Sequence, residues 1–229
     1  MSDPAGNGCR AVLFDLDGTL ADTAPDMADA LNRLRGEQGL GPLPYPVIRP
    51  RVSHGGVALV RLGFGLEPDD PRFEPLLLRF RDLYRADLTS RTRLSDGMEG
   101  LLGELEGRGL PWGIVTNKPA WLTGPLLEAM GLDRRAGCIV SGDTTAHAKP
   151  HPAPMQHATG TLGVDPRHCI YVGDAERDIQ AGRSVGMVTL IAGFGYLGDD
   201  DIPGEWGADG RIEHPAEILD WVEQFTPRH

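Results

Sequence analysis

The chain has 229 residues, with 22 Lys and Arg against 33 Asp and Glu, so its formal net charge is −11. This length is enough to bury the core of one large domain, or of a domain with an insertion. The acidic balance argues against a nucleic-acid groove or an anionic membrane patch as the binding surface, because long-range repulsion would oppose the encounter. Any phosphate-bearing ligand must therefore be small and locally neutralised.

Membrane attachment and secretion also find no support in the sequence. No stretch approaches the roughly 20 uninterrupted apolar residues of a membrane span, and the N-terminal segment MSDPAGNGCR has no apolar signal-peptide core. The three cysteines, Cys9, Cys138 and Cys169, are too widely spaced for a zinc ribbon, and their odd number does not fit a disulfide framework. We therefore expect a cytoplasmic protein, and both a monomer and a homodimer remain open.

Short apolar runs predict the strands of the fold. The first, Arg10 to Phe14, ends in acidic residues and glycine, which is typical of a buried strand followed by a loop. Similar runs follow at residues 110–116, 138–141, 169–172 and 187–192, and helical patterns at 119–130, 152–162 and 175–185 separate them. This alternation predicts an α/β fold with a doubly wound parallel sheet.

The alternation stops between Pro25 and about Ser90. Two apolar stripes with helical spacing occupy this interval, over residues 27–34 and 73–84, and a shorter helix is expected at residues 56–62. The Pro- and Gly-rich stretch GLGPLPYPVIRP between them predicts a loop. We therefore expect a helical cap at residues 23–90, inserted into a core formed by residues 1–22 and 91–229.

The strongest chemical signal is AVLFDLDGTL, at residues 11–20, where the first strand leads Asp15 and Asp17 into a glycine turn. Ligands of parallel sheets bind beyond the carboxyl ends of the strands. Residues two apart in an extended segment share a face, so we expect the two carboxylates to converge. Two like charges held together are costly unless a cation neutralises them or one of them keeps its proton.

Further polar residues follow the later strands, namely Thr116, Asn117, Lys149, Asp174 and Asp178. Carboxylates, one hydroxyl and one ammonium together suit phosphoryl transfer with Mg²⁺, which prefers carboxylate, carbonyl and water oxygens. Each piece alone has an ordinary explanation as a turn residue or a helix cap. Their combination in this order favours a site.

In this order, the pieces resemble the motifs of the haloacid dehalogenase-like phosphatases, in the capped branch that includes phosphoglycolate phosphatases. The resemblance runs from Arg10 to about Val222, and VSHGG, WGIVTNKP and GDAERDIQAGR are similar to bacterial proteins labelled phosphoglycolate phosphatase. Some of that subgroup are instead N-acetylmuramic acid 6-phosphate phosphatases. The resemblance implies a Rossmann-like core, Mg²⁺ as cofactor and a small phosphorylated metabolite as partner. Phosphoglycolate is the first expected substrate, and the amino-sugar phosphate is the alternative.

The resemblance also implies roles for the core residues. Asp15 would attack phosphorus and form an aspartyl-phosphate, and Asp17 would protonate the leaving alkoxide and then deprotonate the attacking water. Thr116 would hydrogen-bond the phosphoryl oxygens, and Lys149 would neutralise the transferring charge. Mg²⁺ would be held by Asp15, the backbone carbonyl of Asp17, and Asp174, with Asp178 fixing the ligand geometry or a bound water.

The leaving group is expected to be selected by the cap. Ser53, His54 and Gly55 are the best candidates to face the core, with Arg51 as an anion contact and Asn117 touching the substrate from the core. A plain loop between two cap helices explains the cap residues equally well. Lys118, which with Lys149 makes up all the lysine of the chain, either contacts substrate or simply ends its loop.

Single residues separate the competing functions. A dehalogenase would lack the second carboxylate, Asp17, and a phosphonate hydrolase would need a cap lysine, which the expected cap lacks. A capped sugar phosphomutase shares every core motif and stays open. A phosphoacceptor signalling domain is more distant, because its aspartate would follow a later strand. The G-x-G-x-x-G match at residues 193–198 precedes three aspartates, which would repel a dinucleotide pyrophosphate.

Overall fold

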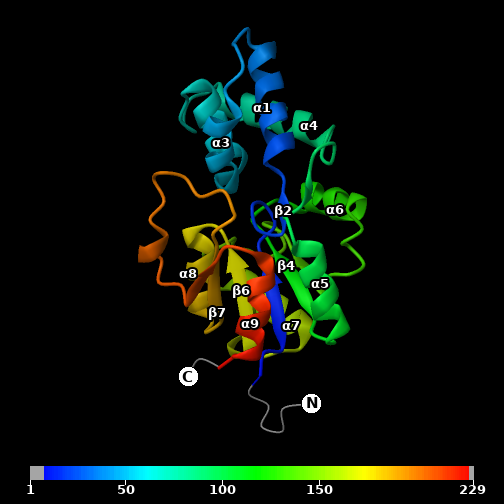
Figure 1. Ribbon diagram of the computed structural model, residues 1–229. Coiled ribbons are helices and arrows are strands. Elements are labelled where there is room, and N and C mark those ends of the chain that lie inside the picture. Colours follow the sequence, from blue (N-terminus) through cyan, green and yellow to red (C-terminus); the bar gives the residue numbers. More distant parts are fainter. Residues whose placement is uncertain (1–7, 227–229) are drawn as a thin grey trace.

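The computed structural model describes residues 8–226. The expectation about a signal-peptide core depends largely on residues 1–7, which lie outside the described residues. Within the described range, no helix is both long and apolar enough to cross a membrane. A sheet with surrounding helices forms one part of the molecule, and a separate group of helices lies beyond the carboxyl ends of its strands (Figure 1).

The main sheet has six parallel strands in the order β5-β4-β1-β6-β7-β8. Their bounds are β1 Ala11–Phe14, β4 Trp112–Val115, β5 Cys138–Val140, β6 Cys169–Gly173, β7 Val188–Ala192 and β8 Gly210–Ile212. Parallel strands buried on both faces carry continuous apolar runs, which is why the sequence predicts the first five. It does not predict β8, because only Ile212 in that strand is buried.

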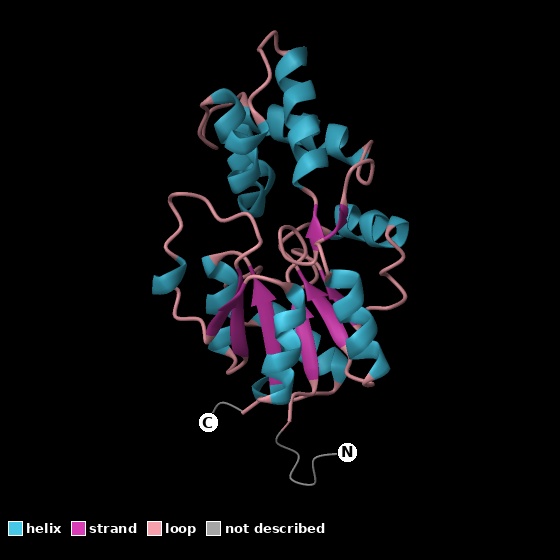
Figure 2. Ribbon diagram, viewed as in Figure 1, coloured by secondary structure: helices cyan, strands magenta, loops and turns pink. Residues whose placement is uncertain are grey.

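Both faces of the sheet are covered by helices (Figure 2). Alternate side chains of β1 enter different cores: Val12 and Phe14 pack in one cluster, whereas Ala11 and Leu13 pack in another. The helices that contribute to this part of the molecule are α5 Met98–Gly107, α6 Ala120–Ala129, α7 Ala153–Leu162, α8 Glu176–Ser184 and α9 Ile218–Glu223. The predicted doubly wound α/β fold is confirmed.

The strand order places β1 at the centre of the sheet, where the direction of winding changes. The chain continues from β1 to β4 and β5 on one side, and to β6, β7 and β8 on the other. In open α/β sheets, a crevice forms at the carboxyl ends of the strands beside such a switch point. The residues directly after β1 therefore occupy the position where a ligand is expected.

The second group of helices lies between two short antiparallel strands, β2 Ala21–Asp22 and β3 Arg93–Leu94. It comprises α1 Ala24–Glu37, α2 Tyr45–Ile48, the 3-10 turn η1 Arg49–His54, α3 Gly55–Phe64 and α4 Phe73–Arg85. The apolar stripes of the sequence lie in α1 and α4, which pack against each other. The Pro-rich stretch expected as a loop instead contains α2 and η1, because proline is tolerated in the first turn of a helix.

Candidate active site

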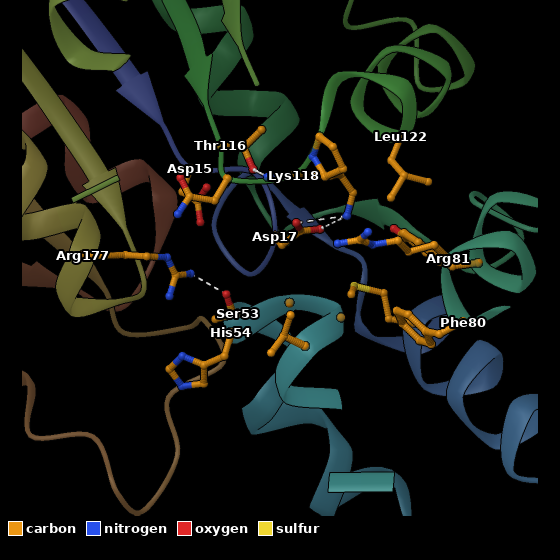
Figure 3. A pocket seen from close by; sticks show the side chains of 17 residues that line it. Asp15, Asp17, Ser53, His54, Phe80, Arg81, Thr116, Lys118, Leu122 and Arg177 are labelled. Carbon is orange, nitrogen blue, oxygen red and sulfur yellow. Dashed lines mark hydrogen bonds and ion pairs between the residues drawn. The ribbon is translucent and has the colours of Figure 1, made fainter. Parts of the chain in front are cut away.

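A cavity of about 320 Å³ lies between the carboxyl end of the sheet and the helices inserted after β2. Its lining combines core residues with residues of α1, η1, α3 and α4 (Figure 3). The core contributes Asp15, Asp17, Thr116, Asn117, Lys118 and Arg177. Most of the core residues that the sequence predicts for the site thus meet at one cavity.

Asp15 and Lys149 form the buried centre of this arrangement. Asp15 directly follows β1 and is 3% exposed, and the side chain of Lys149 is wholly buried. The Lys149 ammonium donates hydrogen bonds of 2.7 Å to Asp15 Oδ1, to the Val115 carbonyl and to the Tyr171 hydroxyl. Burial raises the pKa of the Asp15 carboxyl above its usual value, and the Lys149 charge opposes that shift. A compact ammonium with three donors therefore has its full complement of partners inside the protein.

Three buried carboxylates lie together beside this centre. Asp15, Asp174 and Asp178 each offer an oxygen, and the three oxygens lie within 4.8 Å of one another. Asp174 Oδ1 is buried without a hydrogen-bond partner in the described part of the chain. Burial, together with the charges of Asp15 and Asp178, raises the pKa of Asp174 to about 7. A bound cation would relieve both the orphaned oxygen and the repulsion, so these residues fit a divalent cation site.

Asp178 contributes to the cation cluster and also to the lysine centre. Its Oδ1 lies 2.7 Å from the Lys149 ammonium, and its Oδ2 accepts a hydrogen bond from the Ala175 backbone at 3.1 Å. The side chain is wholly buried. Asp178 is therefore held from two sides, which fits a residue that fixes the geometry of its neighbours.

The Asp17 carboxylate does not join these three. Its oxygens lie 2.8 and 3.0 Å from the Lys118 ammonium, and Oδ1 also accepts a hydrogen bond of 2.6 Å from the Thr23 hydroxyl. Asp15 and Asp17 both line the cavity, but their carboxylates contact different lysines, Lys149 and Lys118. Gly18 follows Asp17 directly, and its φ of 85° favours glycine at this turn.

Asn117 lines the cavity and also holds the backbone of Lys149. Its side-chain amide donates to the Lys149 carbonyl and accepts from the Lys149 backbone N–H, both at 2.9 Å. These two bonds use one amide N–H and one lone pair of Oδ1, so one donor and one acceptor site of Asn117 remain for a substrate. Thr116 also lines the cavity, and its Oγ1 accepts a hydrogen bond of 3.1 Å from the Lys118 backbone N–H.

The inserted helices approach the carboxylates through η1. Ser53, His54 and Gly55 line the cavity, and the Ser53 hydroxyl donates to Asp174 Oδ2 at 2.6 Å. Burial and the nearby Arg177 lower the pKa of His54. The structure does not bring Arg51 to this cavity. Its side chain is 44% exposed and forms an ion pair of 2.6 Å with Asp200, so the expected anion contact at Arg51 is wrong for this cavity.

The sequence does not single out Arg177 or Tyr196, which hold the two parts of the molecule together. Arg177 donates to the Ser53 carbonyl. Burial disfavours its charge, but the carboxylates of Asp178 and Asp15 outweigh burial and raise its pKa. The Tyr196 backbone N–H donates to Asp174 Oδ2 at 2.8 Å, and the tyrosine hydroxyl accepts from the backbone of Thr23 and donates to Asp22. Tyrosine and arginine also occur in ordinary cores and surfaces, so the sequence carries no signal for these contacts.

Comparisons with known proteins identify a family for this chain. A family model described as haloacid dehalogenase-like hydrolase matches residues 9–186. The chain is 44% identical over 220 residues to a phosphoglycolate phosphatase of Xanthomonas campestris pv. campestris, covering 96% of this chain and 98% of that protein. It is 40% identical over 215 residues to an N-acetylmuramic acid 6-phosphate phosphatase of Pseudomonas aeruginosa, covering 94% of this chain and 95% of that protein.

Solved structures agree with these relatives. The crystal structure of a predicted phosphoglycolate phosphatase from Haemophilus somnus is 26% identical and superposes with a TM-score of 0.82, covering 93% of this chain and 97% of that one. A haloacid dehalogenase-like family protein from Streptococcus pneumoniae has the same fold, with a TM-score of 0.76 at 22% identity over 93% of this chain and 98% of that one. The buried Asp15 with its lysine, the carboxylate cluster and these likenesses lead to one assignment: the chain belongs to the haloacid dehalogenase-like hydrolases and is a phosphatase.

Proposed function

We propose that this enzyme is a Mg²⁺-dependent phosphomonoester hydrolase in which Asp15 attacks phosphorus and residues 23–90 act as a cap over the reaction. The observation that carries the proposal is the setting of Asp15. Its carboxylate is buried, contacts Lys149 at 2.7 Å and lies beside two further carboxylates that fit a cation. When bound there, Mg²⁺ would neutralise the carboxylates and the phosphoryl oxygens.

The protein side of the first step follows from this setting. The free lone pairs of Asp15 attack phosphorus, the bond to the leaving oxygen breaks, and an aspartyl-phosphate results. Lys149 places its ammonium beside Asp15 and the transferring group, while Asn117 holds the Lys149 backbone in place. Thr116, on the same cavity wall, would hydrogen-bond a phosphoryl oxygen.

Asp17 serves the leaving group. It would donate a proton to the departing alkoxide and then take one from the water that hydrolyses the aspartyl-phosphate. Lys118 and the Thr23 hydroxyl contact the Asp17 carboxylate and fix its orientation. Thr23 directly precedes α1, so the inserted helices and the acid/base group are connected by one hydrogen bond.

Phosphoglycolate is the first proposed substrate, since the relative at 44% identity bears that activity in its name. N-acetylmuramic acid 6-phosphate is the second. It is supported by the relative at 40% identity and by a cavity of about 320 Å³, partly walled by Met27, Phe80 and Leu122, which offers more room and more apolar surface than a two-carbon acid needs.

Phosphate release from a panel of small phosphomonoesters tests the proposal. We expect kcat/KM for one of the two named substrates to exceed that for generic esters by at least tenfold. Asp15→Asn is the matched control, because the amide is nearly isosteric but a poor nucleophile. It should abolish turnover while the protein melts cooperatively near the wild-type temperature. Turnover by Asp15→Asn within tenfold of wild type would refute the covalent role of Asp15.

A further inference from the structure

The cavity contains a cation that no protein group neutralises. Lys149 is engaged by Asp15 and Asp178, and Lys118 by Asp17. Arg81 on α4 also lines the cavity, but it has no hydrogen bond or ion pair with any of residues 8–226. A partly buried guanidinium without an acidic partner is available for a ligand anion.

A second unsatisfied group lies one helical turn further along α4. Tyr84 follows Arg81 by three residues, so both side chains lie on one face of the helix and reach the same cavity. The Tyr84 hydroxyl is buried and has no hydrogen-bond partner among the described residues. Burial raises the pKa of Tyr84 to about 12, so the phenol stays protonated and can donate. An unpaired buried hydroxyl costs free energy, which a ligand acceptor would recover.

The position of Arg81 indicates which part of a substrate it meets. Figure 3 shows the Arg81 side chain extending toward Asp17 from the right, whereas Arg177 comes from the left and its guanidinium lies near Asp15. Asp17 is the group that would protonate the leaving oxygen, and Arg177 belongs to the end of the cavity with the three carboxylates. Arg81 is thus placed beside the leaving group and Arg177 beside the phosphoryl group.

We propose that Arg81 and Tyr84 form a binding site for a carboxylate on the leaving group, so that the enzyme selects phosphomonoesters of hydroxy acids. The planar guanidinium can hold both oxygens of a carboxylate, and the phenol can donate a further hydrogen bond. This inference rests on the proposed function and deepens it, because it names the residues that recognise the substrate. Arg81 and Tyr84 thus take the role of anion contact that the sequence predicts for Arg51, which forms an ion pair with Asp200 outside the cavity.

The contribution of the substrate carboxylate can be measured with pairs of phosphomonoesters that differ mainly in whether they carry it. N-acetylmuramic acid 6-phosphate differs from N-acetylglucosamine 6-phosphate by its carboxylated ether, and phosphoglycolate differs from 2-hydroxyethyl phosphate by the oxidation of one carbon. We expect wild-type kcat/KM to favour the acid in at least one pair by tenfold or more. Arg81→Gln should reduce kcat/KM for that acid at least tenfold, mostly through KM, and leave its neutral counterpart within twofold. Tyr84→Phe should also reduce kcat/KM selectively for the acid, but by a smaller factor than Arg81→Gln.

Arg79→Gln is the control, since it removes an equal charge from the same helix. Arg79 is exposed and pairs with Glu37, and it is absent from the cavity lining. It should leave both members of each pair unchanged. Equal losses on acid and neutral esters in Arg81→Gln, or no loss on the acid, would overturn the proposal. Selective loss on bisphosphorylated sugars alone would also overturn it, because the site would then read a second phosphate.

A binding measurement separates this inference from the proposed function. If wild type releases phosphate from no ester, the proposed function fails. Isothermal titration with the carboxylated alcohols, N-acetylmuramic acid and glycolate, still examines the subsite in the same protein. Binding of either acid that Arg81→Gln weakens at least fivefold and Arg79→Gln leaves intact supports the site. Equal binding to wild type and Arg81→Gln, or no binding to either, contradicts it.

Discussion

The Ser53 hydroxyl donates a hydrogen bond of 2.6 Å to Oδ2 of Asp174. Ser53 belongs to the 3-10 turn of the inserted helices, and Asp174 directly follows β6 of the sheet. The other oxygen of Asp174, Oδ1, is buried without a hydrogen-bond partner among the described residues, and Asp174 belongs to the cluster of three carboxylates. The Asp174 carboxylate therefore contacts the inserted helices and also belongs to the candidate cation site.

Ser53→Ala removes the side-chain donor that lowers the pKa of Asp174, while the Tyr196 backbone donor remains. Asp174 then holds its proton more firmly, so Mg²⁺ competes with protons less well. We expect the Mg²⁺ concentration for half-maximal activity to rise about threefold to tenfold at pH 6.5, and less at pH 8, in titrations of phosphate release. Ser90→Ala, a substitution of an exposed cap serine bonded to Asp87, is the control and should match wild type.

Lys149→Met should be both inactive and unstable. The wholly buried ammonium pairs with Asp15 and Asp178, so its loss leaves two carboxylates without their cation. Breaking a buried pair from one side costs about 3–5 kcal/mol. Urea unfolding at pH 7 measures this loss. Lys149→Arg keeps the charge, but a planar fork cannot make the same compact contacts, so most activity should disappear. Wild-type turnover in Lys149→Arg would contradict the assigned geometry.

The stability of the metal-free protein should depend on pH through Asp174. Its pKa is raised from 3.8 in the reference state to about 7 in the folded protein. Between these values the folded state binds more protons than the unfolded state, so this group stabilises the fold at low pH. That contribution is lost as pH rises through about 7. Thermal melts in EDTA from pH 5 to 8 should show a fall in melting temperature, and the profile of Asp174→Asn should be flatter. If the melting temperature of Asp174→Asn falls equally steeply with pH, the pH dependence comes from a group other than Asp174.

Divalent cations should control activity according to their size. EDTA should silence phosphate release and Mg²⁺ should restore it, because Asp15 and Asp174 repel each other when no cation is present. Ca²⁺ should bind and inhibit, since it takes more ligands at longer bonds and can draw both oxygens of Asp15 away from phosphorus. Full activity in chelator would contradict the proposed cation site.

The sequence predicts those parts of the fold whose residues show a local pattern, either a continuous apolar run or a helical spacing of apolar residues. β1 is readable because both faces of the strand are buried, and α4 because Phe73, Leu77 and Phe80 repeat with helical spacing. Asp15, Lys149 and Asp174 could be placed at one site because parallel strands end at the same edge. Strand β8 is not predicted because its sequence has little apolar character. Backbone pairing with β7 holds β8 in the sheet.

The parts that the sequence misses depend on distant contacts. From the sequence, Arg51 is the expected anion contact, and the role of Lys118 stays undecided. The local sequence does not show that Arg51 pairs with Asp200 or that Lys118 pairs with Asp17. Arg81 stands in a helix rich in arginine. Only its position on the cavity wall distinguishes Arg81 from Arg79, which forms an ion pair with Glu37.

Tyr196 has two ends with different attachments. Its backbone N–H binds Asp174, and its hydroxyl accepts from the Thr23 and Ala24 amides at 2.7 and 2.9 Å, where α1 begins. A free energy of coupling between two such sites acts equally in both directions. A cation that immobilises Asp174 would favour the hydrogen-bonded state of the Thr23 and Ala24 amides and so increase their protection from hydrogen exchange. A closed cap would in turn bind the cation more tightly by the same factor, so Tyr196 would couple cation affinity to the population of the closed cap.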